Sequence, residues 1–148
     1  MSEVLNKPEV ARIYIDARGP RFGAAITTVV FAAALATHNA WFIIAQATVF
    51  AIGAFKGPQF TPYAYIYKFA VKPFLKGAVP TEDVRPPQFA QSVGLLFALV
   101  AIAGALLDID AIVIGAVSMA LGAAFLNAAF NFCLGCEIYL LLLRARKN

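Results

Sequence analysis

Two long stretches without a charged side chain limit the folds open to this chain more than any other feature. No Asp, Glu, Lys or Arg occurs in residues 22–55 or 88–107. Of the 148 residues, 61% are hydrophobic and 14% are charged, whereas a water-soluble domain needs roughly 25% charged residues to cover its surface. The composition therefore predicts a polytopic membrane protein that has the lipid bilayer as its solvent, and it argues against a soluble domain.

The apolar runs predict an all-α fold with four transmembrane helices arranged as two tandem hairpins. They cover about residues 20–37, 40–55, 88–107 and 111–143. A bilayer core needs roughly 20 residues, so the first two runs are a little short. The fourth run is too long for one straight crossing at about 1.5 Å per residue, and we expect a break near residues 131–137.

The chain is expected to form a single membrane domain over residues 1–148 with four parts. The first hairpin repeat covers about 16–55 and the cytoplasmic interfacial loop about 56–87. The second hairpin repeat covers about 83–132, and a C-terminal interfacial segment covers about 133–148.

The positions of the basic residues predict the orientation of these hairpins. All twelve Lys and Arg residues lie in the N-terminal lead, the middle loop or the C-terminal end, and the turns at His38 and at Asp108 to Asp110 have none. The positive-inside rule then places both termini and the middle loop in the cytoplasm, and the two hairpin turns on the outer side of the membrane. The pI near 9.3 does not indicate nucleic acid as a partner, because the basic residues border apolar segments and form no single basic face.

An internal repeat supports the same topology. The pattern D-x-R-x-P-x-F occurs twice, each time directly before a helix that opens a hairpin. Its members are Asp16, Arg18, Pro20 and Phe22 in the first copy, and Asp83, Arg85, Pro87 and Phe89 in the second. Two parallel hairpins related by an axis along the membrane normal are expected. We favour an anchoring role for the motif over a catalytic one, with each Asp paired to the Arg of its own copy or of the other copy.

Shorter patterns predict the packing and the middle loop. Small residues at Ala90, Gly94 and Ala98, and at Ser118 and Gly122, predict faces of close helix approach. In the loop, a short amphipathic helix is expected to rest at the membrane interface with its tyrosines at headgroup depth. The residues that indicate it are the N-cap Thr61, the helix-starting Pro62, and Tyr63, Ile66, Tyr67 and Ala70 at helical spacing.

The candidate for chemistry is the C-x-x-C pair Cys133 and Cys136, near the cytoplasmic end of the fourth run. Cysteines in a reducing compartment are expected as thiols, and this spacing also allows a reducible disulfide at a helix start. Helix packing, redox or sulfur transfer, and metal binding all remain open for the pair. Zinc needs about four ligands, so no cofactor is predicted, and a metal shared through these cysteines requires a partner or a dimer.

Two asparagines precede the cysteines. Asn127 and Asn131 are four residues apart, which predicts one helical face turned to the bundle interior or to a cavity. Interhelical hydrogen bonding is favoured over ligand binding for these side chains. No charged residue interrupts the centre of a predicted span, which argues against an ion pump or proton-coupled transporter.

Three segments together resemble an uncharacterised family of small four-helix bacterial membrane proteins, classed as a domain of unknown function. They are R-G-P-R-F-G from Arg18 to Gly23, R-P-P-Q-F-A-Q from Arg85 to Gln91, and F-N-F-C-L-G-C-E from Phe130 to Glu137. The likeness covers nearly the whole chain. Members of that family are often encoded near thioredoxin-like or sulfurtransferase proteins, so the resemblance implies a thiol or sulfur-relay role carried by Cys133 and Cys136.

Three functions follow as hypotheses. In the leading one, the C-x-x-C exchanges electrons or sulfane sulfur with a thioredoxin-like partner, with Cys133 attacking and Cys136 resolving. In the second, the chain is a non-catalytic accessory subunit of a larger electron-transfer or transport complex in the membrane. In the third it carries a small sulfur compound past Asn127, Asn131 and the cysteines. The sequence leaves open whether the protein is an enzyme.

Overall fold

The computed structural model describes residues 14–75 and 77–147 and is mainly helical. Its α-helices are α2 (Arg18–Thr37), α3 (Ala40–Phe55), α4 (Pro62–Ile66), α5 (Arg85–Leu106), α6 (Asp110–Phe130) and α7 (Leu134–Lys147). The short helices are η1 (Pro58–Phe60), the π-helical turn η2 (Tyr67–Val71) and η3 (Lys72–Phe74). The strands are β1 (Tyr14–Asp16) and β2 (Thr81–Asp83).

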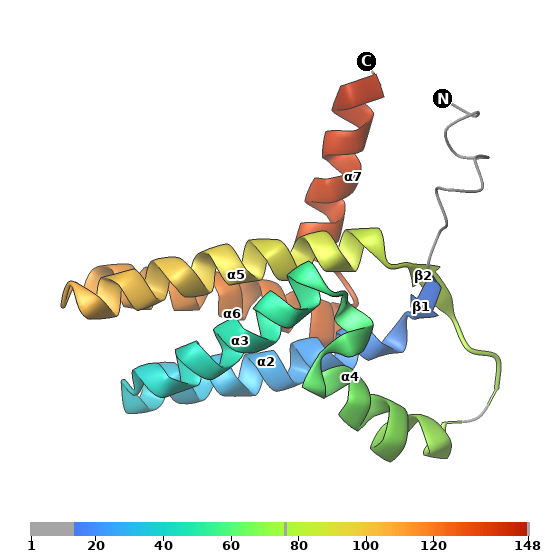
Figure 1. Cartoon of the computed structure of the whole chain (residues 1–148), viewed down its shortest axis with the longest axis horizontal. Coiled ribbons are helices and arrows are strands. Elements are labelled where there is room, and N and C mark those ends of the chain that lie inside the picture. The colour runs from blue at the N-terminus through green and yellow to red at the C-terminus, as the bar shows by residue number, and fades with distance from the viewer. Residues whose placement is uncertain (1–13, 76, 148) are drawn as a thin grey trace.

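Four helices lie side by side as two hairpins, α2 with α3 and α5 with α6 (Figure 1). Each hairpin packs across onto the other, because α2 contacts α6 while α3 contacts α5. This exchange of partners is what a two-fold relation between two repeats produces. Both hairpin turns lie at one end of the bundle, and β1, β2, α4 and α7 gather toward the opposite end, which we call the sheet end (Figure 1).

Three of the four bundle helices, α2, α5 and α6, are long and apolar enough to cross a membrane. The first apolar run, predicted at about residues 20–37, was too short, because α2 begins at Arg18 and has 20 residues. The second run, predicted at about residues 40–55, has the same bounds as α3, which has only 16 residues. A helix of that length spans about 24 Å, less than the roughly 30 Å of a bilayer core. Four complete crossings are therefore not established.

The core of the bundle consists mainly of small residues that pack around a few large side chains. Phe31, Val117 and Ala101 are fully or almost fully buried where the two hairpins meet. Large apolar side chains instead cover much of the outside of the bundle, among them Val29, Trp41, Leu96, Leu106 and Met119. This distribution is the reverse of that on a soluble protein, where contiguous exposed apolar patches are rare.

A small antiparallel sheet corrects the prediction of an all-α fold. β1 pairs with β2 in the register Tyr14 to Asp83, Ile15 to Glu82 and Asp16 to Thr81. Three residues per strand leave no periodic pattern, and the partners are far apart in the sequence, so sequence periodicity could not find them. The sheet brings the two D-x-R-x-P-x-F motifs together at one end of the bundle (Figure 1).

The long fourth run is interrupted as predicted. α6 ends at Phe130, Asn131 adopts a left-handed conformation with φ of 54°, and α7 starts at Leu134. The Asn131 amide donates to the Asn127 carbonyl at 3.1 Å, which closes the helix end. α7 then leaves the bundle at a steep angle instead of continuing along α6 (Figure 1).

The predicted close-approach faces differ in outcome. On α5, Gly94 meets the ring of Phe50 from α3, and a Cβ there would come within 2.7 Å of the ring. Ala98 on the same face is buried, as expected. On α6, Ser118 and Gly122 are exposed and Gly122 has open space beside it, so this second prediction was wrong within one chain.

The middle loop contains the predicted short helix. Thr61 is its N-cap, since its hydroxyl accepts from the Ala64 amide at 3.2 Å, and Pro62 is the first helical residue. Tyr67 is buried and Tyr63 half-buried; the Tyr63 hydroxyl bonds to Gln46 of α3, and the Tyr67 hydroxyl bonds to Asp16 of β1. The tyrosines therefore dock the loop onto the first hairpin and the sheet, and their place at headgroup depth stays a prediction.

Candidate functional site

The two copies of the repeat motif form the same local structure at the start of α2 and of α5. In each copy the Asp carboxylate accepts from the backbone amide of the Arg at 3.0 Å and from its Nε at 3.1 Å. Asp16 pairs with Arg18, and Asp83 with Arg85, so each copy is closed on itself. A carboxylate here satisfies a first-turn amide that has no helical partner. The geometry is that of an anchor at the helix start.

In each copy of the motif, the residue directly before the Phe donates a hydrogen bond to a carbonyl at the end of a helix in the other hairpin. Arg21 donates from Nε to the carbonyl of Ala128 at 2.9 Å, at the end of α6. At the matching position in the second copy, the Gln88 side chain donates to the carbonyl of Ala54 at 2.9 Å, at the end of α3. Each hairpin thereby satisfies a late carbonyl of the other, which supports the two-fold relation at the level of side chains.

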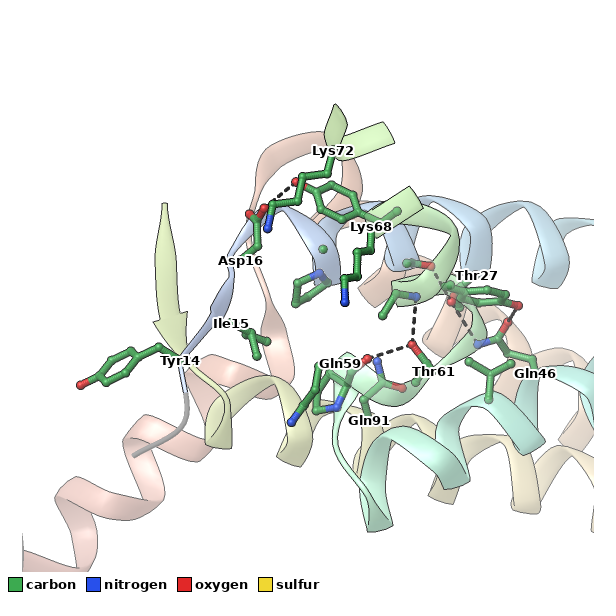
Figure 2. Close-up of a pocket in the computed structure, with 18 residues that line it drawn as sticks. Tyr14, Ile15, Asp16, Thr27, Gln46, Gln59, Thr61, Lys68, Lys72 and Gln91 are labelled. Carbon is green, nitrogen blue, oxygen red and sulfur yellow. Dashed lines mark hydrogen bonds between the residues drawn. The ribbon is translucent and has the colours of Figure 1, made fainter. Parts of the chain in front are cut away.

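Aromatic contacts extend the repeat beyond the hairpins. Phe22 lies 5.8 Å from the ring of Tyr67, and Phe89 lies 5.6 Å from the ring of Tyr139 in α7. The Tyr67 hydroxyl also donates to Asp16 at 2.8 Å, one of the dashed contacts of Figure 2. α7 thus occupies in the second repeat the place that η2 occupies in the first.

The contact between Tyr67 and Asp16 shifts the pKa values of both groups. Burial alone would raise the pKa of Asp16, but hydrogen bonds from Arg18 and Tyr67 lower it below its ordinary value. Burial and the bond to Asp16 raise the pKa of Tyr67 to about 12. Asp16 is therefore a carboxylate and Tyr67 a neutral phenol near neutral pH.

A buried chain of hydrogen bonds joins the middle loop to the first hairpin. Tyr63 donates to Gln46 Oε1 at 2.7 Å, and Gln46 Nε2 donates to the Thr27 hydroxyl at 3.0 Å, both drawn in Figure 2. Thr27 in turn donates to the carbonyl of Gly23 at 2.9 Å. Gln46 is fully buried, so this chain satisfies a side chain that would otherwise be costly inside an apolar bundle.

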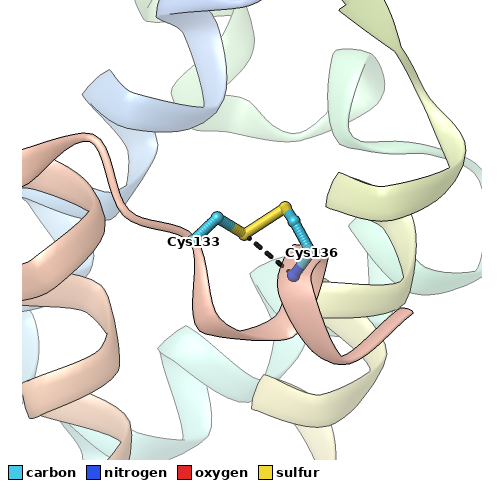
Figure 3. Close-up of a disulfide and its surroundings, with 2 residues drawn as sticks. All are labelled: Cys133 and Cys136. Carbon is cyan, nitrogen blue, oxygen red and sulfur yellow. Dashed lines mark hydrogen bonds between the residues drawn. A yellow bond between two sulfur atoms is a disulfide. The ribbon is translucent and has the colours of Figure 1, made fainter. Parts of the chain in front are cut away.

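Cys133 and Cys136 form a disulfide at the point where the chain turns from α6 into α7 (Figure 3). Their Cα atoms are 5.2 Å apart, and both residues are half-buried. Free thiols were expected for a reducing compartment, and the structure has the bonded form instead. The pairing itself is the one that the C-x-x-C spacing allowed.

The backbone places the sulfur of Cys133 at a helix start. Glu137 donates its amide to the Cys133 carbonyl at 3.0 Å, so Cys133 is the N-cap of α7. The Cys136 amide donates to Cys133 Sγ at 3.2 Å, the dashed line of Figure 3. Amides of the first helical turn and the helix dipole both stabilise negative charge on such a sulfur.

Gly135, between the cysteines, sets how closely α7 approaches α5. A Cβ on Gly135 would come within 2.6 Å of both Cα and Cβ of Ala90. Only a glycine allows the two backbones to lie at this separation. The position of the disulfide therefore depends on the pair Gly135 and Ala90.

Cys133 also lines a cavity of about 310 Å³ between the helices. Most of the wall is apolar, with Phe50, Phe97 and Met119, and Asn127 and Gln91 add polar groups. Protein cavities of about 300 to 1,000 Å³ are typical for small ligands. One cysteine of the pair thus lines a cavity of a size that admits a small molecule.

The comparisons with known proteins identify a family. A family model described as a domain of unknown function (DUF4395) matches residues 15–144. The chain belongs to the DUF4395 family. No curated protein and no solved structure matches it. The match agrees with the resemblance to an uncharacterised family. It covers all the described helices and strands, except the first residue of β1 and the last three residues of α7.

One sequence prediction about the site of this DUF4395 chain needs correction. Asn127 is half-buried and lines the cavity, but Asn131 is exposed beyond the end of α6, so the two do not share a helical face. Arg144 and Arg146, the basic residues of α7 that precede Lys147, lie near its far end, about 15 Å along the helix from the cysteines. The nearest stabilising group for a Cys133 thiolate is the Cys136 amide.

Among the described residues, no three His, Cys, Asp or Glu side chains are grouped so that they could hold a metal ion. His38 lies in the turn between α2 and α3, at the end of the bundle opposite the sheet end.

The sequence patterns assigned no role in the site to Arg21, Gln46, Gln88 and Gln91, and they indicated Tyr63 only as a residue of the middle-loop helix. A signal existed for Gln46, since an amide inside an apolar run usually bonds across helices. Arg21 and Gln88 stand at the same position in the two copies of the motif, and this position could have indicated a shared role. Because one side chain is a guanidinium and the other a carboxamide, the pattern D-x-R-x-P-x-F treats the position as variable.

Proposed function

We propose that this DUF4395 chain is a thiol-redox or sulfur-relay protein of the bacterial cytoplasmic membrane. In this proposal the Cys133–Cys136 pair, at the cytoplasmic boundary, exchanges electrons or sulfane sulfur with a soluble thioredoxin-like or sulfurtransferase protein. The observation that carries the proposal is the bond from the Cys136 amide to Cys133 Sγ at the first turn of α7.

The membrane part rests on the outer surface of the bundle. Three helices have the length and hydropathy of membrane spans, and large apolar side chains face outward along them. In water such a surface would drive aggregation, whereas lipid solvates it at no cost.

The orientation rests on where the basic residues lie. At the sheet end, α2 and α5 begin with Arg18 and Arg85, and the segment that carries Lys68 and Lys72 docks beside them. The hairpin turns at the opposite end hold no Lys or Arg. By the positive-inside rule, the sheet end then faces the cytoplasm, and the disulfide lies toward that side.

The thiol chemistry follows from the different surroundings of the two sulfurs. In the oxidised form, a thiolate of the partner attacks Cys133 Sγ, the disulfide breaks, and Cys136 leaves as a thiolate. A second partner thiolate then attacks the partner's sulfur in the mixed disulfide and releases Cys133 as a thiolate. The partner leaves as a disulfide, two electrons have passed to the cysteine pair, and the two thiolates take up protons from solvent.

The reverse direction uses the same atoms. A Cys133 thiolate, held by the Cys136 amide, attacks a partner disulfide and displaces one partner thiolate. Cys136 then attacks Cys133 Sγ and releases the partner as a dithiol. If the partner carries a persulfide, Cys133 attacks its outer sulfur, takes that sulfur as a persulfide and leaves the partner as a thiolate.

Reversible oxidation of the pair tests this proposal. We expect the purified full chain to bind no maleimide when oxidised, and two maleimides after treatment with reduced thioredoxin, as measured by intact-mass spectrometry. Oxidised thioredoxin should restore the unlabelled state. The chain with both cysteines replaced by serine is the control for labelling elsewhere. Cysteines that respond to neither form of thioredoxin would contradict the proposal.

The second candidate function is an accessory subunit of a larger membrane complex. It is favoured by α3, whose 16 residues are too few to cross a bilayer core unaided and whose Trp41 and Phe55 are exposed at the two ends. A partner protein that covers these ends would remove the mismatch. Inert cysteines in the labelling experiment would leave this function as the better one.

A further inference from the structure

An apolar stripe on α7 stays exposed along most of the helix. Leu134, Ile138, Leu141 and Ala145 lie on one side of α7, within an arc of about 60° at about 100° per residue. All four are exposed, and Leu141 is the most exposed of the three large side chains, at 58%. We call these four residues the α7 stripe. A contiguous apolar surface of this kind marks contact with a membrane or with another protein.

The bundle holds α7 by a different side of the helix. Gly135 lies against Ala90 of α5, and the two backbones come close there. The ring of Tyr139 lies 5.6 Å from the ring of Phe89, also on α5. Gly135 and Tyr139 lie about 110° around the helix from the middle of the α7 stripe. Docking onto α5 therefore leaves the stripe uncovered.

The start of the α7 stripe shows which way it faces. Leu134 and Ile138 line the cavity beside Cys133. Phe97 and Met119 line the same cavity from the middle of α5 and of α6, so the stripe is turned toward the middle of the bundle and away from the sheet end. α7 crosses the direction of the bundle helices steeply, near the sheet end (Figure 1). In a bundle that spans a membrane, such a helix lies along the membrane surface with its stripe toward the lipid chains.

Basic residues flank the α7 stripe near the end of the helix. Arg144 and Arg146 are exposed and lie on opposite sides of the stripe, about 90° and 110° from its middle. Neither arginine forms an ion pair with another described residue. Lys147 follows them in the sequence, and Glu137, the acidic residue of α7, is about two turns before Arg144. Arginines on both flanks of an apolar helix face reach lipid phosphates while that face stays among the lipid chains.

We propose that α7 lies along the cytoplasmic surface of the membrane and binds anionic phospholipid there. The α7 stripe contacts the part of the lipid chains nearest the head groups, and the guanidinium groups of Arg144 and Arg146 bind the lipid phosphates. Anionic lipid is favoured over zwitterionic lipid, because neither arginine is paired with an acidic group of the described chain and both attract net negative charge. The inference rests on the membrane part of the proposed function and is independent of its thiol chemistry.

The position of α7 also sets the depth of the cysteine pair. Cys133 is the N-cap of α7 and Cys136 lies in its first turn, so a helix on the membrane surface holds both cysteines near the head groups. A soluble partner then reaches the pair at the membrane surface and does not have to enter the lipid.

Spin labels at two neighbouring leucines test the position of α7 in the full chain. Leu140→Cys and Leu141→Cys are made separately in the chain with both native cysteines replaced by serine. Each carries a maleimide spin label in vesicles of phosphatidylcholine and phosphatidylglycerol. Leu141 belongs to the α7 stripe, whereas Leu140 is about 100° further round, beyond Arg144. We expect the Leu141 label to collide mainly with oxygen, which is soluble in lipid, and the Leu140 label to collide mainly with a water-soluble nickel complex.

A label at Leu96→Cys is the reference for the bundle. Leu96 is 61% exposed in the middle of α5, so its label lies among the lipid chains of a membrane that the bundle spans. Equal behaviour of the Leu140 and Leu141 labels, with Leu96 protected from nickel, would overturn the proposal and leave the membrane part of the function intact. Nickel access at Leu96 would contradict the membrane part, and the proposal with it. Magnetic coupling between the Leu141 labels of two chains would also overturn the proposal, because the stripe would then bind a second copy.

Charge variants test the choice of lipid. In nanodiscs that mix the two lipids, Arg144→Gln combined with Arg146→Gln should lower the retention of phosphatidylglycerol relative to phosphatidylcholine, as measured by native mass spectrometry. The expected loss is up to about fivefold for each arginine, the usual contribution of one basic residue near an anionic surface. Arg144→Lys combined with Arg146→Lys keeps the charge and is the matched control, so its retention should equal that of the unaltered chain. An unchanged ratio in the glutamine variant would overturn the binding of anionic lipid by α7.

Discussion

Replacement of Cys136 by serine is expected to turn a transient contact with a thioredoxin-like protein into a stable mixed disulfide through Cys133. In the native chain, the Cys136 thiol attacks Cys133 Sγ and frees the partner, and serine cannot make this attack. The measurement uses reduced Cys136→Ser, mixed with a thioredoxin that keeps only its attacking cysteine and carries a leaving thiol on that cysteine. The Cys133 thiolate attacks the thioredoxin sulfur and expels the leaving thiol. A non-reducing gel should show the covalent adduct as the main species.

The matched variant for this experiment is reduced Cys133→Ser, mixed with the same activated thioredoxin. It should form much less adduct, because the Cys136 thiol lacks the amide hydrogen bond that Cys133 Sγ accepts at the start of α7 and that stabilises a thiolate. The unaltered reduced chain should form the adduct only briefly, because Cys136 then attacks Cys133 Sγ and releases the thioredoxin thiol. Equal trapping by both single variants would contradict the assignment of Cys133 as the attacking residue. No trapping by either would contradict exchange with this class of partner.

The second large effect is expected from Gly135→Ala. Its new methyl group would lie within 2.6 Å of the backbone of Ala90, so α7 must move away from α5. We expect a loss of about 1 to 3 kcal/mol in the free energy of unfolding, the usual range for forced overpacking. The movement also shifts Cys133 and Cys136, so labelling of the two cysteines should change. Unfolding of the detergent-solubilised chain, followed by circular dichroism, measures the first effect.

Gly122→Ala provides the control for helix propensity. Gly122 also lies inside a helix, but open space surrounds it, so alanine there should be neutral or stabilising by up to about 1 kcal/mol. The contrast between the two substitutions isolates the contact with Ala90. If Gly135→Ala is as stable as Gly122→Ala, α7 does not pack against α5 as closely as the structure shows.

The helices of this fold were largely predictable, because apolar runs in a chain with few charges have a single physical meaning. Bounds such as Ala40–Phe55 agreed with the sequence, and the break after Phe130 followed from a run too long to be one helix. The start of α2 was missed, because Arg18 and Gly19 look unfavourable for an apolar helix. The Asp16 carboxylate bonds the Arg18 amide there and lets the helix begin earlier.

The pairing of distant segments could not be predicted from local patterns. β1 and β2 are three residues each, and their pairing depends on the two hairpins being packed first. The same holds for Tyr63 and Tyr67, whose helical spacing also suits a membrane surface. Only the buried Gln46 and the carboxylate of Asp16, on other elements, explain why these tyrosines turn to the bundle.

The candidate site was predictable in its residues and only partly in its geometry. The C-x-x-C spacing identified Cys133 and Cys136, and their place at the start of a new helix followed from the expected break. Asn131 was placed on a helical face because the i, i+4 rule assumes an unbroken helix. Its left-handed conformation ends the helix instead, and no single-residue preference distinguishes the two outcomes in an apolar run.

The most direct test of the account is the sidedness of the reactive cysteine. Inside-out and right-side-out membrane vesicles are prepared from cells that produce the full chain with Cys136→Ser. After mild reduction, a membrane-impermeant maleimide is added to each kind of vesicle. Labelling of Cys133 in inside-out vesicles alone is the predicted result, because the sheet end and the start of α7 face the cytoplasm in the proposed orientation. Labelling from the opposite side alone, or none from either side, would contradict it.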